Sequence, residues 1–173
     1  MNSQIIIQAL RFVGLVLVQV LVLRRLMLEW QSFTWFNIFI YPLYLFLLPF
    51  STPRWAQLLL GFFLGLSIDL FYDSPGIHAS ASVFLAYIRP YILFSIKPRA
   101  GYSATFKPTM RSQGVGWFVQ YASILLILFL LWYHSAEAFS FVYIGDILLR
   151  TFFGYIFSLA AIMLLMYIFN PKE

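Results

Sequence analysis

The feature that most constrains this chain is a series of long apolar segments, which leaves no stretch that could fold as a soluble domain. An apolar bilayer core about 30 Å thick needs roughly 20 residues of helix. Six segments qualify, and they cover residues 5–23, 33–50, 55–72, 77–96, 115–133 and 147–169. We therefore expect an all-α integral membrane protein, with one transmembrane domain over residues 1–173 and six transmembrane helices in one bundle.

Composition narrows the range of partners. The chain is 62% hydrophobic and 10% charged, whereas soluble domains average about 25% charged residues. Its formal charge of +5 is scattered between apolar segments, so we expect membrane lipids and not nucleic acid as partners. The chain has no cysteine, which excludes a disulfide, a thiolate nucleophile and a cysteine-ligated metal.

The positions of the cations predict the orientation. With six spans both termini lie on one side, together with Arg54, Lys97, Arg99, Lys107, Arg111 and Lys172. The other side has Arg24 and Arg25, with Arg150 at the edge of the last span. The positive-inside rule therefore places both termini in the cytoplasm. The connection 97–114 carries cations and no anion, so we expect it to lie against the membrane surface.

Asp69 is the last of three residues that are spaced four apart on the third span. Gly61, Gly65 and Asp69 are four residues apart and share one helical face, on which the glycines allow another helix to approach closely. A carboxylate at this position is either poised for chemistry, paired in a transport path or satisfied by structure.

The turn that follows Asp69 favours the structural role. Ser74-Pro75 is typical of an N-cap followed by proline at the first helical position, which leaves free backbone donors at the start of the next span. We expect Asp69 to accept hydrogen bonds there and to hold the hairpin between the third and fourth spans. His78 and Ser80 are candidate side-chain partners.

Two other sets of polar residues lie within the spans. Arg89 is nearer to the cytoplasmic face than to the outer one, and its level differs from that of Asp69 by about 9 Å, so we expect it to snorkel toward the cytoplasmic face instead of forming an ion pair. A polar stripe on the first span, within about 80° at 100° per residue, should face protein or a water-filled cavity. It consists of Gln4, Gln8, Arg11 and Gln19. For Arg11 alone, snorkelling is the simpler expectation.

Motifs for catalysis are weak. The acids in Tyr72-Asp73 and Gly145-Asp146 lie at span ends, and the Gly-x-Ser-x-Gly and His-Glu-x-x-His patterns are missing from the sequence. Two histidines, His78 and His134, are too few for a convincing metal site, and we expect both at the membrane interface. We predict no enzymatic activity, no cofactor and no metal.

Several of these features together resemble the rod shape-determining protein MreD family. The resemblance rests on Pro42 and Pro49, on Gly61-x-x-x-Gly65-Leu66-x-x-Asp69, and on the turn Ser74-Pro75-Gly76-Ile77-His78-Ala79. It is specific over residues 42–90, while the flanking spans agree in number and hydropathy only. The phenylalanine- and tyrosine-rich composition departs from better-known members.

The resemblance implies a non-catalytic scaffold in the bacterial cell inner membrane. It would act in the cell-elongation complex that extends peptidoglycan, with MreC, the MreB filament and the synthetic enzymes as partners. The family is also similar in architecture to the substrate-binding subunits of vitamin transporters, so a small-molecule carrier is the main alternative, and an intramembrane hydrolase is third. The residues that we expect in helix packing or partner contact are Gly61, Gly65, Asp69, His78, Arg89, Gln8 and Arg11.

Overall fold

The computed structural model describes residues 2–29, 37–98, 102 and 108–169, and within these ranges all regular structure is helical. Five of the helices are long and apolar enough to cross a membrane, which makes the chain a multi-pass membrane protein. The order is α1 (Asn2–Leu17), the π-helical turn η1 (Val18–Leu23), α2 (Arg24–Glu29), α3 (Leu43–Phe46), α4 (Arg54–Tyr72), α5 (Ile77–Ser95), α6 (Met110–Gln113), α7 (Val115–Ala138), the 3-10 turn η2 (Phe141–Tyr143) and α8 (Ile144–Phe169).

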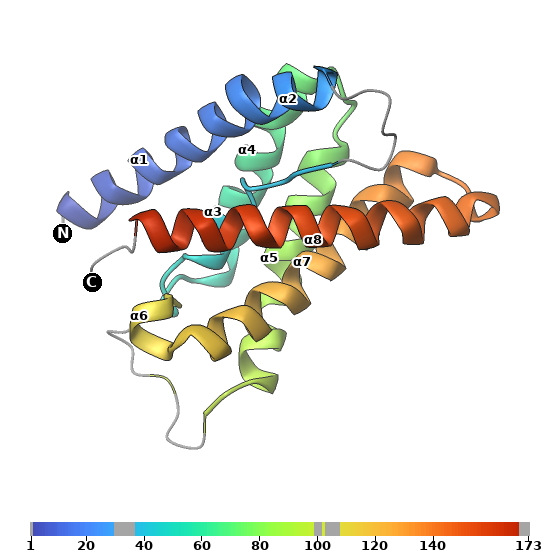
Figure 1. Ribbon diagram of the computed structural model, residues 1–173. Coiled ribbons are helices and arrows are strands. Elements are labelled where there is room, and N and C mark those ends of the chain that lie inside the picture. The colour runs from blue at the N-terminus through green and yellow to red at the C-terminus, as the bar shows by residue number, and fades with distance from the viewer. Residues whose placement is uncertain (1, 30–36, 99–101, 103–107, 170–173) are drawn as a thin grey trace.

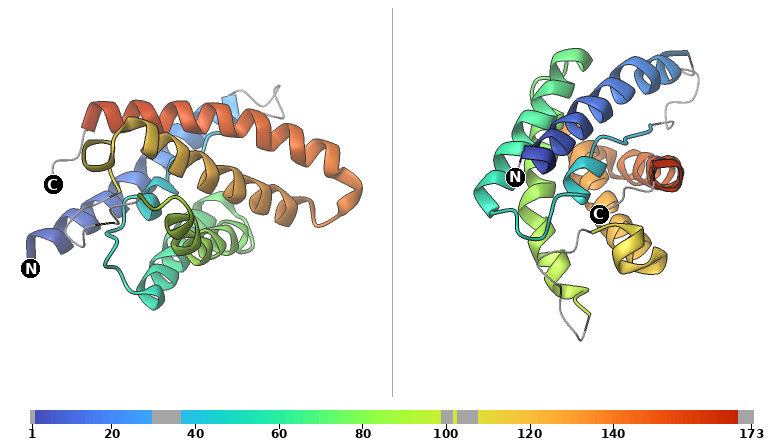
Figure 2. Two further views of the ribbon diagram at one scale, coloured as in Figure 1. Left: turned by 90° about the horizontal axis from the view of Figure 1, so that it is seen from below. Right: turned by 90° about the vertical axis from the view of Figure 1, so that its left-hand side faces the viewer.

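The long helices alternate between two ends of the bundle. The start of α1 and the end of α8 lie at one end, which we call the terminal end, together with the start of α4, the end of α5 and the start of α7 (Figure 1). The opposite, hairpin end contains the α4–α5 and α7–α8 connections. Along the chain α4 packs on α5, α5 on α7 and α7 on α8. Viewed from the terminal end, α4 and α5 lie to one side and α7 and α8 to the other (Figure 2).

The expected second span is not a continuous helix. Residues 33–36 lie outside the described ranges, and residues 37–53 form an irregular segment whose only helix is the single turn α3. We call residues 37–53 the inner segment. It runs between the two pairs of helices (Figure 2), and residues 39–48 are all buried.

Two prolines explain why this apolar segment does not form a helix. Proline has no N–H to donate, and it disfavours helical geometry in the residue before it. Pro42 is accepted as the residue preceding α3, while Pro49 follows shortly after the helix ends. Only the few residues between them form a helical turn, so the prediction of a continuous helix over 33–50 is wrong for residues 37–50 outside α3.

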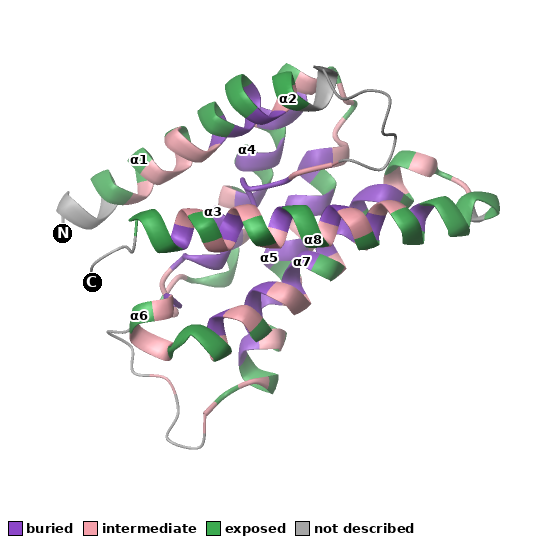
Figure 3. Cartoon of the chain, viewed as in Figure 1, coloured by how far each residue is buried: buried purple, intermediate pink, exposed green. Residues whose placement is uncertain are grey.

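The other five expected spans correspond to helices. Those predicted at 55–72 and 77–96 agree with α4 and α5 to within one residue, whereas α7 continues to Ala138 and α8 begins at Ile144. The core gathers around the inner segment, while α1 and α8 carry long exposed faces (Figure 3). Exposed apolar faces of this kind suit lipid contact.

Candidate functional site

The inner segment presents a physical problem, because non-helical backbone inside a membrane protein needs partners for its N–H and C=O groups. Much of the buried polar chemistry of the described chain meets this need. Gln19, on η1, is fully buried; its amide donates to the Ile38 carbonyl at 3.0 Å and accepts from the Ile40 N–H at 2.9 Å. The same amide also contacts the Tyr72 hydroxyl at 3.1 Å, which ties the segment to the end of α4.

Ser158 supplies a partner from α8. Its hydroxyl oxygen accepts a hydrogen bond from the Phe39 N–H at 2.8 Å, and the residue is fully buried. Side chains on the first and last long helices therefore hold adjacent residues of the inner segment at the hairpin end.

Arg89 holds the other part of the segment. Only 1% of the residue is exposed, so the prediction that it snorkels out is wrong. Its guanidinium donates to the Tyr121 hydroxyl at 2.8 Å, to the Gln57 amide oxygen at 3.0 Å and to the Leu48 carbonyl. These acceptors surround the guanidinium and keep it inside the bundle.

Two of the groups that bind Arg89 bind the inner segment as well. The Tyr121 hydroxyl donates to the Phe46 carbonyl at 3.2 Å, and the Gln57 amide donates to the Thr52 carbonyl at 2.8 Å. Arg89, Tyr121 and Gln57 thus form one network that satisfies carbonyls along the segment between α3 and α4.

Asp69 has the structural contacts expected for it, with different side-chain partners. Its carboxylate accepts from the backbone N–H groups of His78, at 3.0 Å, and Ala79, at 2.8 Å, and from the Ser74 hydroxyl. The helix begins after Gly76, with φ of 85°, and not at Ser74. The proposed Ser74-Pro75 cap is therefore wrong, because Ser74 turns back to the carboxylate that caps α5.

The side chains of His78 and Ser80 are used elsewhere. The Ser80 hydroxyl donates to the Ile77 carbonyl at 2.9 Å. His78 is fully buried, and its Nδ1 is 2.9 Å from the Tyr41 hydroxyl of the inner segment. The ring of His78 packs among aromatic residues that include Phe39 and Tyr133. His78 lies in the first turn of α5, and its depth at the membrane interface stays a prediction.

Gly61 and Gly65 face the backbone of α5. A Cβ added at Gly61 would lie 2.8 Å from the Ser82 carbonyl oxygen, and one at Gly65 would overlap the backbone of His78 and Ala79. The two glycines and Asp69 thus occupy one continuous contact between α4 and α5.

Gln8 and Arg11 take no part in these networks. Gln8 Oε1 and Arg11 Nη1 are covered but have no hydrogen-bond partner among the described residues. Arg11 lines an otherwise apolar cavity of about 450 Å³ between α1 and α8. Of the polar stripe, Gln19 makes the interhelical contacts, and the side chain of Gln4 lies outside the described part of the structure.

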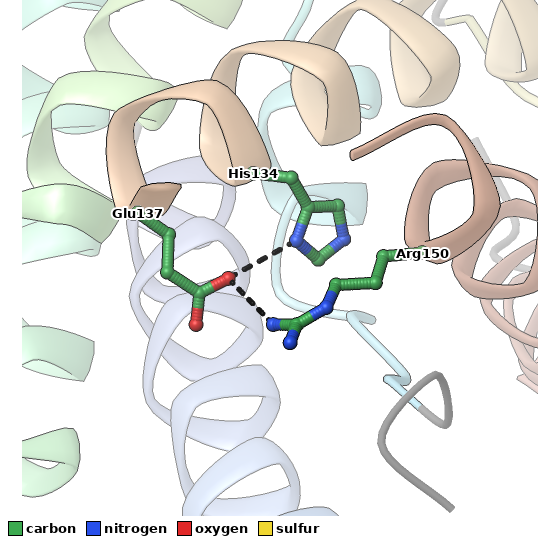
Figure 4. Close-up of polar contacts among 3 residues, drawn as sticks. All are labelled: His134, Glu137 and Arg150. Atoms are coloured by element: carbon green, nitrogen blue, oxygen red, sulfur yellow. Dashed lines mark hydrogen bonds and ion pairs between the residues drawn. The ribbon is translucent and has the colours of Figure 1, made fainter. Parts of the chain in front are cut away.

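A charged cluster at the hairpin end was not foreseen from the sequence. Glu137 lies 3.2 Å from His134 Nδ1 and 3.5 Å from Arg150, so that one carboxylate oxygen joins α7 to α8 (Figure 4). His134 is 1% exposed and lies near the end of α7, so it is buried within the protein, and its depth at the membrane interface stays a prediction. The cluster lines a cavity of about 310 Å³ with Asp146 and Tyr143. The spacing of His134 and Glu137 was visible in the sequence, but the approach of Arg150 across the connection was not.

These contacts define the class of protein: a multi-pass helical membrane protein built around a buried inner segment that side chains of the surrounding helices hold in place. No protein-family model matches the chain, and neither a curated protein nor a solved structure matches it. Among the described residues, no group of three or more histidines and acids is placed to hold a metal ion.

Proposed function

We propose that this chain is a non-catalytic component of the bacterial cell-elongation complex, acting in the inner membrane as a scaffold with MreC. The proposal rests on the structural roles of the residues that carry the resemblance to the MreD family. Pro42 and Pro49 bracket the single turn of the inner segment, while Gly65 and Asp69 fix the α4–α5 hairpin. Each has a role in building a rigid shape.

The chemistry of the interior supports a scaffold over an enzyme. Asp69 accepts three hydrogen bonds from its own hairpin, and the guanidinium of Arg89 is bound to three neutral acceptors. A general acid or base needs a proton that it can exchange with substrate. Groups engaged in this way serve better as structural partners.

We further propose that the inner segment is a sixth, non-helical crossing. Its residue Ile38 is bound near the end of α4 through Gln19 and Tyr72, and Thr52 lies two residues before the start of α4. The segment therefore accompanies α4 over its 19 residues, about 28 Å of helix. Six crossings would leave both termini on one side, and the cations at that end favour the cytoplasm.

Co-purification tests the scaffold role. The chain would be co-expressed with the MreC protein of the same genome and purified in mild detergent, with an unrelated single-span protein of the same topology as control. We expect MreC to be retained at a fixed ratio and the control to be lost. Loss of both proteins would overturn the proposed partnership.

The hairpin-end cavity favours a second candidate, a small-molecule carrier. Its lining includes His134 and Arg150, whose Nε2 and Nε atoms are covered without a hydrogen-bond partner in the described structure. A volume of about 310 Å³ suits a small polar molecule. Mass spectrometry of small molecules released from the same purified chain distinguishes the candidates, because a carrier should release one compound that His134→Ala no longer retains.

A further inference from the structure

Arg89 is the one lysine or arginine of the described chain that is fully buried. Its three hydrogen-bond acceptors, a hydroxyl, an amide oxygen and a backbone carbonyl, are all neutral. Buried charges in proteins are ordinarily paired with an opposite charge, because desolvation is costly. Neutral acceptors offset part of this cost and leave the positive charge uncompensated.

No described carboxylate is close enough to neutralise Arg89. Asp69 is bound to the first turn of α5, and Arg89 lies 11 residues after His78 on the same helix, a distance of about 16 Å along the axis. Asp73, Glu137 and Asp146 also lie at the hairpin end, at the termini of α4, α7 and α8. The described acids and Arg89 thus occupy opposite halves of the bundle.

A cavity of about 340 Å³ adjoins Arg89 at the terminal end. Lys97 contributes a second cation to its lining, and Phe50, Leu93 and Phe94 contribute apolar surface. Phe94 is 79% exposed, which places one wall on the outer face of α5, where lipid would lie. The cavity therefore combines two cations with an apolar side that faces the membrane.

The remaining wall includes Tyr102. Its hydroxyl donates to the Leu93 carbonyl at 3.0 Å, and its ring stacks on Phe50 with centroids 4.5 Å apart. Partial burial raises the pKa of Tyr102, so the phenol stays neutral and adds no negative charge that would oppose an anion.

We propose that this cavity binds the phosphate group of an anionic phospholipid, with Arg89 and Lys97 as the cationic partners. Guanidinium and ammonium groups together suit a phosphate, and the apolar wall suits the glycerol and first acyl carbons of a lipid. Arg89 is six residues before the end of α5, about 9 Å from it, and Lys97 follows that end, so the cavity lies toward the terminal end of the span. This site does not depend on the proposed partnership with MreC.

Native mass spectrometry and thermal unfolding of the purified full chain test the site. The chain in neutral detergent would be titrated with phosphatidylglycerol, phosphatidylcholine or inorganic phosphate at matched concentrations. We expect phosphatidylglycerol to be retained and to raise the unfolding temperature, and the other two to have little effect. Equal retention of both lipids would overturn the site, and equal stabilisation by inorganic phosphate would overturn the lipid as its source.

Two variants that each remove one positive charge distinguish lipid binding in the cavity from general attraction of anionic lipid to the protein surface. Removing Arg89 also strips Leu48 of its partner and endangers folding, so Lys97→Gln carries the test. Arg111→Gln, at an exposed position of α6 outside the cavity lining, is the matched control. We expect affinity for phosphatidylglycerol to fall roughly fivefold in Lys97→Gln and to stay unchanged in Arg111→Gln. Equal losses in both variants would overturn the proposal.

Discussion

The side chain of Gln19 on η1 accepts a hydrogen bond from the backbone N–H of Ile40, at 2.9 Å, while donating to the carbonyl two residues earlier. One amide thus replaces the pairing that a neighbouring strand would give to an extended segment. The π-helical turn places this amide inside the bundle, and such turns are frequent at sites with a special role. The shape of the interior therefore depends on a few long-range contacts between side chains and backbone.

Replacing Gln19 with methionine should destabilise the protein strongly. The change keeps the volume but leaves the Ile38 carbonyl and the Ile40 N–H without partners, at about 1–3 kcal/mol for each buried group. Thermal unfolding in detergent measures the effect. Leu21→Met, on the same turn at a position that is 62% exposed, should unfold like the wild type, and a Gln19→Met protein as stable as this control would disprove the role of the amide.

Removal of the Arg89 guanidinium should open the inner segment locally. Because the chain contains no cysteine, a single Leu45→Cys provides a clean thiol at a position with no exposed surface. In the Arg89→Met background we expect its labelling rate in detergent to rise at least about tenfold, since a hydrogen bond to a charged group contributes about 1.5–3 kcal/mol. Trp55→Cys, at an exposed position, should label equally in both backgrounds. An unchanged rate for Leu45→Cys would contradict the network.

Gly65 should not accept even a methyl group. A Cβ there would overlap the backbone of α5, which cannot give way as a flexible side chain can, so Gly65→Ala should lower the unfolding temperature and Gly65→Leu should prevent folding. Gly116→Ala on α7 is the matched control, because a Cβ there meets nothing within 4 Å. Alanine is also favoured over glycine in helices by up to about 1 kcal/mol. Similar unfolding temperatures for Gly65→Ala and Gly116→Ala would refute the close contact.

Cysteine labelling in spheroplasts should show on which side of the membrane each end of the bundle lies. Val142→Cys, 85% exposed at the hairpin end, should react with an impermeant thiol reagent in intact spheroplasts. Arg111→Cys, at the terminal end, should react only after lysis. The reverse pattern would show that the proposed orientation is wrong, while reaction of a cysteine at residue 2 in intact spheroplasts would argue against the sixth crossing.

The α4–α5 hairpin was predictable because its determinants are local. Gly61, Gly65, Asp69 and the turn lie within 20 residues, and helical spacing alone places the first three on one face. The exact start of α5 was not predictable. Whether Ser74 or Gly76 precedes the helix depends on the hydrogen bond that the Ser74 hydroxyl donates to Asp69.

The inner segment illustrates the opposite case. Its apolar composition fits a buried helix and a buried irregular chain equally well, and Pro42 and Pro49 were the only local signals of the difference. The residues that make it possible, Gln19, Arg89 and Ser158, lie far from it in sequence; the Phe39–Ser158 bond joins residues 119 apart. Spacing within a single helix carries no information on such partners.

Asp69 gives the sharpest contrast between structure and chemistry. In Asp69→Asn, the remaining carbonyl oxygen can still accept from the His78 N–H, and Ser74 can reorient, so most of the cap survives. In Asp69→Leu, the N–H groups of His78 and Ala79 lose their partner, at about 1–3 kcal/mol each. A catalytic or proton-coupled carboxylate would instead fail in both variants, because an amide does not exchange a proton at working pH.

Complementation of a rod-shape defect, in a bacterium lacking its own MreD, tests the central claim most directly, with the membrane abundance of each variant measured alongside. We predict that the wild type restores rod shape, that Asp69→Asn retains most of this activity, and that Asp69→Leu loses both abundance and activity. An Asp69→Asn protein that is as abundant as the wild type and yet as inactive as Asp69→Leu would contradict the structural role of Asp69, and failure of the abundant wild type itself would contradict the proposed function.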